Sequence, residues 1–354
     1  MKVLKFGGTS VGSAQRMKEV AKLITDGERK IVVLSAMSGT TNTLVEISDY
    51  LYKKNPEGAN EIINKLESKY RQHIDELFAT PEYKQKGLEL IKSHFDYIRS
   101  YTKDLFTLFE EKVVLAQGEL ISTAMMNYYL QECGVKSVLL PALEYMRTDK
   151  NAEPDPVYIK DKLQVQLELH PDAEIYITQG YICRNAYGEI DNLQRGGSDY
   201  TASLIGAAIN ASEIQIWTDI DGMHNNDPRI VDKTAPVRHL HFEEAAELAY
   251  FGAKILHPTC IQPAKYANIP VRLLNTMDPT APGTLISNDT EKGKIKAVAA
   301  KDNITAIKIK SSRMLLAHGF LRKVFEIFES YQTSIDMICT CLLYTSPSPR
   351  DRQK

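Results

Sequence analysis

The residues best placed to do chemistry come first in the chain. Lys2 to Val11 form an apolar strand that runs directly into the glycine pair Gly7 and Gly8, with Lys5 before the pair and two hydroxyl residues after it. Glycines let a backbone approach an anion and offer N–H groups, a following helix adds its positive end, and Lys5 supplies a mobile charge. The spacing fits neither the P-loop nor the dinucleotide fingerprint. An ordinary strand-to-helix turn is the alternative, but the pattern predicts a phosphate-binding loop.

Two further segments carry groups suited to a small polar substrate. Ser35 to Asn42 is rich in hydroxyls and glycine and follows a second apolar strand. Glu119, in Gln117-Gly-Glu, lies on an apolar helix, where its carboxylate could receive an ammonium group. Taken singly, the first segment is equally explained as a solvated connection, and for the second an ordinary helix-face carboxylate is the favoured interpretation.

A second glycine pair follows much later, in Arg195-Gly-Gly-Ser-Asp199, again before a helix. Its arginine is the side chain best shaped to hold a carboxylate through two parallel hydrogen bonds. Trp217 to Gly222 and Asp227 to Arg229 then form a strand end and a turn-rich loop that suit a nucleotide, with plain turns as the alternative. Lys254 adds a second lysine after a helix. Ligands of open α/β sheets bind at such strand ends.

Composition excludes several classes of function. The 354 residues are 43% apolar and 25% charged with a net charge of −2, so we expect no nucleic-acid partner. No apolar run approaches about 18 residues and no signal peptide is visible, so we expect no membrane partner and a cytoplasmic location. The five cysteines are scattered without paired spacing, which predicts reduced thiols and no protein metal site. The histidines do not accompany a recognisable nucleophile elbow, so we expect no Ser/His/Asp or Cys/His catalytic arrangement.

Strand and helix patterns alternate along most of the chain. A strand at Lys2–Phe6, a helix at Ser13–Thr25 and a strand at Ile31–Leu34 make a βαβ unit, which predicts an α/β fold with a parallel sheet. Residues 57–111 are charged and helical in period, and we expect a helical insertion that covers the sheet. Further predicted elements are a helix at Val113–Cys133, strands at Ser137–Leu140, Glu174–Thr178 and Glu213–Trp217, and helices at Tyr200–Asn210 and Phe242–Phe251.

The pattern restarts near the end of the chain. A strand at Ile304–Lys310, a helix at Phe320–Ser330 and a strand at Ser334–Ile338 predict a second, smaller α+β domain, with a boundary between residues 292 and 303. Residues 342–354, with Ser-Pro-Ser-Pro and Arg-Asp-Arg-Gln-Lys, break every period, and we expect a disordered or non-native tail.

Six motifs, in order, resemble those of aspartokinase, a member of the amino-acid kinase family. They are Lys5-Phe-Gly-Gly-Thr-Ser-Val11, Gly118-Glu119, Arg195-Gly-Gly-Ser-Asp-Tyr200, Trp217-Thr-Asp219, Asp227-Pro-Arg229 and Phe251-Gly-Ala-Lys-Ile-Leu-His-Pro258. The resemblance extends from Met1 to about Thr340. It implies a three-layer fold around a mainly parallel sheet. It also implies ATP-dependent phosphorylation of the side-chain carboxylate of L-aspartate to 4-phospho-L-aspartate, the first step toward lysine, threonine and methionine.

The resemblance also implies a role for each matching residue. Lys5, Asp199 and Lys254 would be catalytic. ATP, bound with Mg²⁺, would contact Lys5, Gly7, Gly8, Thr9, Thr218, Asp219, His224, Arg229 and Lys254. L-aspartate would contact Thr41, Glu119, Arg195 and Ser198. His224 departs from the tyrosine that is frequent in the family at this point. A carboxylate acceptor with a pKa of about 3.9 is already ionised, so this chemistry needs no general base.

The same resemblance implies a catalytic domain over residues 1–295 and part of an ACT regulatory module over 303–341. Such modules bind an end-product amino acid, so we expect an amino-acid effector, and a homodimer if the module were complete. Here the module stops after its first half.

Two alternatives stay open. A kinase of the same fold could act on glutamate, N-acetylglutamate or UMP, although the Arg195–Asp199 segment and the long helical insertion argue against this. A catalytically silent amino-acid sensor is the other alternative, and the retained Lys5, Arg195, Asp199 and Lys254 argue against it.

Overall fold

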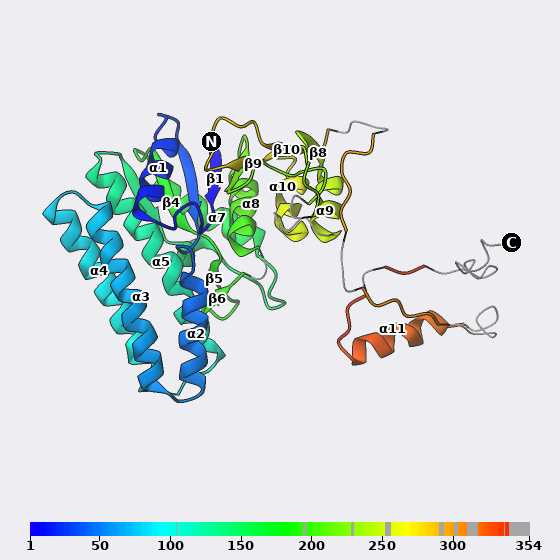
Figure 1. The fold of residues 1–354 in the computed structure, drawn as a ribbon, viewed down its shortest axis with the longest axis horizontal. Helices are drawn as coiled ribbons and strands as arrows, with labels where there is room; N and C mark the ends of the chain where they lie inside the picture. Colours follow the sequence, from blue (N-terminus) through cyan, green and yellow to red (C-terminus); the bar gives the residue numbers. More distant parts are fainter. Residues whose placement is uncertain are drawn as a thin grey trace. The chain divides into compact units, whose positions relative to one another are not determined.

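The computed structural model describes residues 1–103, 105–193, 196–227, 230–251, 256–289, 294–300, 304–309, 318–335 and 337–339, with only the backbone of Phe251. It divides into two compact units, Met1–Lys301 and Asp302–Lys354 (Figure 1). The predicted tail at residues 342–354 lies outside the described residues. The first unit contains the central sheet and the described part of the candidate site.

An eight-stranded sheet forms the centre of the first unit, in the order β3-β4-β2-β1-β7-β9-β10-β8. Its strands are β1 (Lys2–Phe6), β2 (Lys30–Leu34), β3 (Ser137–Leu140), β4 (Ile175–Gln179), β7 (Ile214–Thr218), β8 (His239–His241), β9 (Val271–Asn275) and β10 (Thr284–Ser287). All neighbours pair in parallel except β10 with β9. The predicted α/β fold with a mainly parallel sheet is confirmed. A separate antiparallel hairpin joins β5 (Ile182–Arg184) to β6 (Ile190–Asn192).

Apolar side chains point alternately to the two faces of the sheet, and they therefore form two separate core layers. Leu4 and Phe6 of β1 belong to one hydrophobic cluster, whereas Val3 belongs to the cluster on the opposite face. Successive side chains of a strand point to opposite faces, so Lys5 lies on the same face as Val3.

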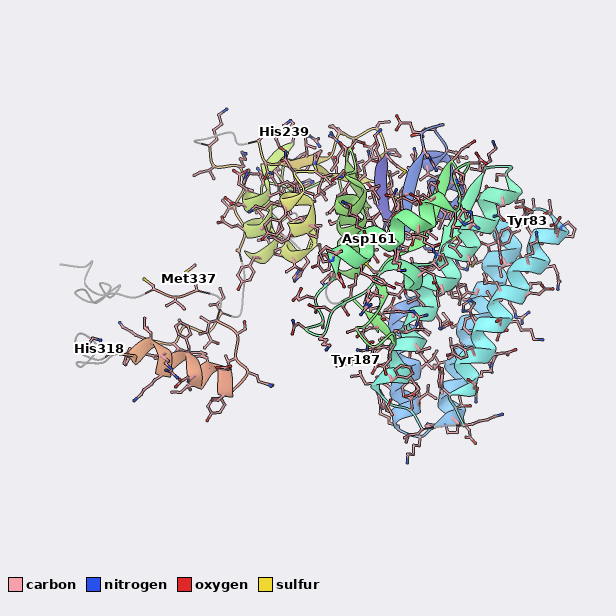
Figure 2. The ribbon with its side chains drawn as sticks, turned by 180° about the vertical axis from the view of Figure 1, so that it is seen from behind. Tyr83, Asp161, Tyr187, His239, His318 and Met337 are labelled. Atoms are coloured by element: carbon pink, nitrogen blue, oxygen red, sulfur yellow. The ribbon has the colours of Figure 1, made fainter. Side chains whose placement is uncertain are left out.

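Helices cover both faces (Figures 1 and 2). The cluster that contains Phe6 draws on α1 (Ala14–Ile24), α2 (Thr40–Tyr52), α3 (Pro56–Leu77), α4 (Pro81–Ser100) and α5 (Leu108–Glu132). The opposite cluster draws on α6 (Ala142–Tyr145), α7 (Pro156–Glu168), α8 (Gly197–Ile209), α9 (Phe242–Phe251), the 3₁₀ turn η1 (Pro258–Ile261) and α10 (Gln262–Tyr266). Asp199 of α8 is therefore on the face of the sheet that carries Lys5.

The predicted insertion over residues 57–111 is helical, but its position differs from the expectation. Its two long helices have their main contacts with other helices: α3 packs on α1 and α2, and α4 packs on α3 and α5. They add an outer layer instead of covering the sheet directly. Each starts at a proline preceded by a capping side chain, Asn55 or Thr80, the arrangement that favours a helix N-terminus.

Two helices begin earlier in the chain than predicted, because of the residues at their N-caps. The helix expected from Val113 begins five positions earlier, at Leu108, because Thr107 and Glu110 form a reciprocal capping box. The helix expected from Tyr200 begins at Gly197, after Gly196 adopts a left-handed conformation with φ of 75°. Both shifts matter for function, since they bring Leu108, Glu111, Ser198 and Asp199 into first turns that border the site.

The second unit contains α11 (Phe320–Ser330), as predicted. The strands predicted over Ile304–Lys310 and Ser334–Ile338 are wrong for the described parts of those ranges, residues 304–309, 334–335 and 337–338. A strand needs a hydrogen-bonding neighbour and a face to bury. Here Ile304, Ile307 and Met337 are exposed, and none of the described residues of α11 is buried. The assignment of this unit to half of a regulatory module stays a prediction.

Candidate active site

Lys5 and Asp199 form an ion pair, with 2.7 Å between Lys5 Nζ and Asp199 Oδ1. Their side chains are 11% and 13% exposed. The pair joins the middle of the sheet to the first turn of α8, where the helix dipole favours an acidic residue. The contact lacks hydrogen-bond geometry at Oδ1, so it is electrostatic. Two glycine-flanked segments that are far apart in the sequence thus meet at one point.

A cavity of about 690 Å³ opens beside this pair. Five of the predicted site residues line it: Lys5, Thr41, Glu119, Ser198 and Asp199. The remaining lining residues were not among the predicted site residues: Ser35, Leu108, Glu111, Lys112, Leu115, Tyr181, Asp191, Asn192, Leu193, Gly196 and Gly197. The cavity is therefore built from the ends of β1 and β2, from α2, α5 and α8, and from the β5–β6 hairpin.

Two helices begin at this cavity. Thr41 lies in the first turn of α2, which follows Gly39 with φ of 82°, and Ser198 lies in the first turn of α8. Neither helix has a side-chain hydrogen bond at its N-cap. The first N–H groups of a helix and its dipole together attract anions. Ser35 Oγ donates to Ser198 Oγ at 2.9 Å and ties the strand end to α8. This side of the cavity suits a carboxylate.

Glu119 supplies a buried carboxylate at the same cavity. Its Oε1 accepts a hydrogen bond from the Ala36 N–H at 3.1 Å, whereas its Oε2 has no partner among the described residues. Burial raises the pKa of the Glu119 carboxyl to about 7, against the opposing effect of the Ala36 hydrogen bond. A buried acceptor without a donor is costly unless a ligand supplies one.

The glycine pair after β1 lies in a loop between the end of this strand and helix α1. The Gly7 N–H donates to Trp217 O at 3.4 Å and so extends the sheet. Helix α1 starts at Ala14, capped by Ser13, which confirms the helix predicted over Ser13–Thr25. Loop residues separate its positive end from the glycine pair. Gly8 is required by close approach, because a Cβ at this position would lie 2.8 Å from Ala36 O.

The predicted nucleotide residues of the next segment lie at the end of β7. Trp217 pairs with Phe6 of β1, and their rings stack with centroids 5.6 Å apart, so Thr218 lies beside the glycine loop. The Asp219 side chain follows at an exposed position. His224 is further along, where its Nδ1 lies 2.8 Å from Thr234 Oγ1. Thr218, Asp219 and His224 do not line the cavity itself.

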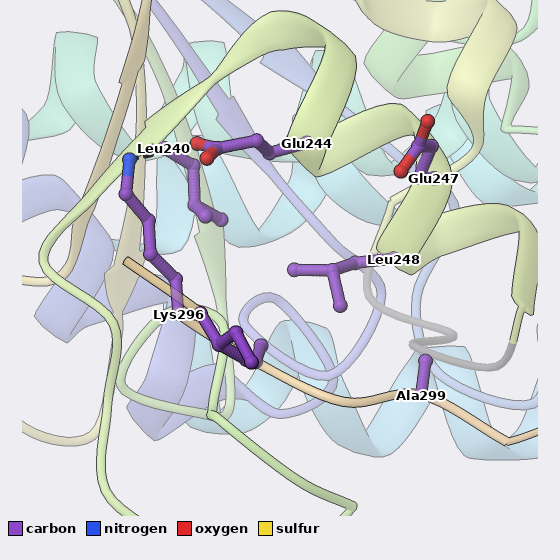
Figure 3. Close-up of a pocket in the computed structure, with 8 residues that line it drawn as sticks. Leu240, Glu244, Glu247, Leu248, Lys296 and Ala299 are labelled. Atoms are coloured by element: carbon purple, nitrogen blue, oxygen red, sulfur yellow. Dashed lines mark hydrogen bonds and ion pairs between the residues drawn. The ribbon is translucent and has the colours of Figure 1, made fainter. Parts of the chain in front are cut away.

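Three predicted residues, Arg195, Arg229 and Lys254, lie outside the described residues. In the described part of the chain, no group of three or more His, Cys, Asp and Glu side chains is arranged to hold a metal ion. A smaller cavity of about 240 Å³ lies between α9 and the segment 294–300, next to the Lys296–Glu244 ion pair (Figure 3). It contains none of the predicted site residues.

Sequence reasoning missed the part of the cavity wall formed by the N-terminal turns of α5 and by the hairpin. Lys112 of α5 pairs with Asp191 of β6 at 2.7 Å, and Tyr181 and Asn192 lie beside them on the cavity. One sequence signal could have indicated this part of the site. Gly180 and Tyr181 follow β4, another strand that ends at this edge of the sheet, where ligands of such sheets bind. The hairpin itself carries no recognisable motif.

Comparisons with known proteins identify the family of the chain. The model of the amino acid kinase family matches residues 1–275. The structure of E. coli aspartokinase III in complex with aspartate and ADP (R-state) superposes with a TM-score of 0.82 at 32% identity, over 96% of this chain and 76% of that chain. The chain belongs to the aspartokinase family.

The same E. coli enzyme in complex with lysine and aspartate (T-state) gives a TM-score of 0.76 at 32% identity, over 96% of this chain and 77% of that one. Aspartokinase 1, chloroplastic, from Arabidopsis thaliana is 38% identical over 350 residues, which are 96% of this chain and 61% of the relative. The chain thus spans less than two thirds of the length of that aspartokinase. In the described residues, no helix combines the length and apolar character needed to cross a bilayer.

Proposed function

We propose that the chain transfers the γ-phosphoryl group of ATP to the side-chain carboxylate of L-aspartate, giving 4-phospho-L-aspartate and ADP. The observation that carries this proposal is the convergence at one cavity of the Lys5–Asp199 pair, two helix N-termini and the unpartnered oxygen of Glu119. A lysine and helix N–H groups suit phosphate and carboxylate, and a buried carboxylate suits an ammonium. L-aspartate carries two carboxylates and one ammonium.

In this proposal Lys5 neutralises charge that develops during phosphoryl transfer, and Asp199 positions the Lys5 ammonium. The acceptor carboxylate is ionised at neutral pH, so no residue has to remove a proton. Gly7, Gly8, Thr9, Thr218, Asp219 and His224 would lie along the nucleotide, together with Arg229 and Lys254. Mg²⁺ would be held mainly by the phosphates of ATP, a common arrangement for this ion.

L-aspartate would occupy the cavity on the other side of Lys5. Thr41 and Ser198, in the first turns of α2 and α8, would bind carboxylate oxygens, with Arg195 as a further carboxylate ligand. Glu119 would receive the ammonium. The E. coli aspartokinase III that was crystallised with aspartate and ADP supports this choice of ligands.

Acceptor-dependent ADP release tests the proposal. Purified chain would be assayed with ATP, Mg²⁺ and, separately, L-aspartate, L-glutamate, N-acetyl-L-glutamate and UMP. We expect ADP release to depend on L-aspartate, and a preference for any other acceptor would overturn the specificity. Lys5→Ala serves as the control for contaminating ATPase activity.

For the second unit we propose half of an ACT module that takes part in binding an end-product amino acid. The lysine complex of the E. coli relative supports an amino-acid effector. Lysine, threonine and methionine are the candidate end products, and dimerisation through a complete module is part of the same proposal. A cytoplasmic location also stays a prediction, since the Arabidopsis thaliana relative is named chloroplastic.

A further inference from the structure

We propose that Asn192 determines specificity for an amino-acid substrate by accepting, through its Oδ1, a hydrogen bond from the α-ammonium group. The inference deepens the proposed function and rests on it. It adds a second acceptor, from a different element, to the one that Glu119 supplies.

Asn192 ends β6 and lines the cavity. Its Oδ1 is buried and has no hydrogen-bond partner within the described part of the chain. Burial raises the pKa of the neighbouring Tyr181 hydroxyl, and the Asn192 side chain opposes that rise. An amide lowers the pKa of a phenol by facing it with its NH₂ group, so the NH₂ group of Asn192 faces the Tyr181 hydroxyl and Oδ1 is left without a donor. Tyr181 therefore holds the Asn192 amide in an orientation in which Oδ1 has no hydrogen-bond donor within the described residues.

Tyr181 is held in a backbone conformation that a bulky residue adopts rarely, with φ of 69°. Its N–H donates to Thr201 Oγ1 at 3.0 Å, and its carbonyl accepts from the Leu193 N–H at 2.7 Å. Gly197 makes room for the ring, because a Cβ there would lie 2.5 Å from Tyr181 Cδ2. Such strain persists only where several contacts impose it, and it concentrates at functional sites.

The other acidic groups of the cavity wall already have partners. Asp191, next to Asn192, pairs with Lys112 at 2.7 Å and attaches the hairpin to α5. Glu111 Oε2 accepts from the Tyr52 hydroxyl at 2.7 Å, and Asp199 pairs with Lys5. Of the described cavity-lining side chains, Glu119 and Asn192 therefore keep a buried oxygen with neither a hydrogen bond nor an ion pair.

The two open acceptors fit one kind of ligand group. An ammonium has three N–H donors and no acceptor, so it can satisfy both oxygens at once. A hydroxyl has a single donor, and a carboxylate would be repelled by Glu119. Hydrogen bonds to a charged group are stronger than neutral ones, so loss of the Asn192 acceptor should weaken binding of the ammonium selectively.

The test compares two ligands that differ in the ammonium. L-aspartate and succinate have the same two carboxylates, and only L-aspartate has the amino group. Their Kd values would be measured by titration calorimetry for the full chain and for Asn192→Leu, which keeps the shape and removes the acceptor. We expect the Kd of L-aspartate to rise about tenfold or more, with the Kd of succinate within about twofold of wild type. KM for ATP should not change.

Asn192→Asp keeps an acceptor at the same place, and we expect it to retain L-aspartate binding within about threefold. Tyr187→Ala is the matched control, because Tyr187 is on the turn of the same hairpin (Figure 2), is exposed and does not line the cavity. It should leave both Kd values unchanged.

Two results would overturn the inference: a parallel rise of both Kd values in Asn192→Leu, which indicates a general structural role, or no change in either. Both concern binding, so they are independent of turnover. Wild-type chain that binds L-aspartate but releases no ADP would contradict the proposed function and leave the Asn192 comparison valid.

Discussion

Lys5 and Asp199 illustrate what residue types can predict and what they cannot. Paired glycines near a lysine, and near an acid, predicted two anion-binding segments, and the structure brings Lys5 and Asp199 to 2.7 Å. Thr41, Glu119 and Ser198 also reach the cavity. Tyr181 and Asn192 were not predicted as site residues. Their position depends on how a short hairpin folds back onto α5, and no local sequence pattern encodes this.

Lys5→Ala tests the residue assigned to the transition state. We expect kcat to fall about a hundredfold or more while KM for L-aspartate changes little, because Lys5 acts on charge that develops during transfer. Steady-state kinetics with varied L-aspartate would check this. An unchanged kcat would remove Lys5 from the mechanism.

Glu119 predicts a pH dependence. Burial raises the pKa of its carboxyl from 4.5 to about 7. In the ligand-free protein this carboxyl is therefore protonated below neutral pH and loses the negative charge that would receive an ammonium. KM for L-aspartate should therefore rise about tenfold per pH unit below about pH 7. In Glu119→Gln the rise should disappear, and KM should be high throughout. A pH-independent KM in the wild type would contradict the assignment.

The same shift predicts an effect on stability with a defined sign. A carboxyl whose pKa rises on folding binds more protons in the native state, so the stability of the ligand-free protein falls as pH increases from about 4.5 to about 7. Glu119→Gln should therefore be more stable than wild type at pH 8 by chemical denaturation, and similar to it at pH 4.

At the scale of elements, the sequence predicted the βαβ order correctly because apolar periodicity is local. Helix starts were less predictable: α5 and α8 begin earlier than periodicity indicates, through the Thr107–Glu110 capping box and the left-handed Gly196. The strands expected at residues 304–310 and 334–338 do not form in the described parts of those ranges, for a different reason. Strand formation depends on a pairing partner, and periodicity says nothing about whether one is present.

Gly8→Ala tests the close approach of the glycine loop to the segment after β2. The added Cβ would meet Ala36 O, a backbone atom, at 2.8 Å. We expect a loss of about 1–3 kcal/mol in unfolding free energy, together with a raised KM for ATP, because the loop must shift.

Gly7→Ala is the matched control for that substitution. Its Cβ would lie 3.5 Å from Lys5 Nζ, the flexible end of a side chain, so its stability should stay close to wild type. Equal stability of the two variants in urea denaturation would show that the loop accommodates a side chain at either position.

At the scale of the whole molecule, every described residue of the candidate site belongs to the unit Met1–Lys301. That unit contains both hydrophobic clusters, whereas the described residues of α11 are not buried. A chain ended after Lys301 should therefore fold, with a thermal midpoint within about 2 °C of the full chain. Calorimetry would check this, and a large drop would show that the second unit supports the first.

In the proposed reaction, the cavity beside Lys5 and Asp199 brings L-aspartate to the γ-phosphate of ATP. Trapping with hydroxylamine tests it most directly, because an acyl phosphate converts to a hydroxamate and other phosphorylated products do not. With ATP, Mg²⁺ and L-aspartate we predict aspartyl hydroxamate in proportion to the ADP released, and less by about a hundredfold or more from Lys5→Ala. ADP released without hydroxamate, or equal hydroxamate from Lys5→Ala, would contradict the account.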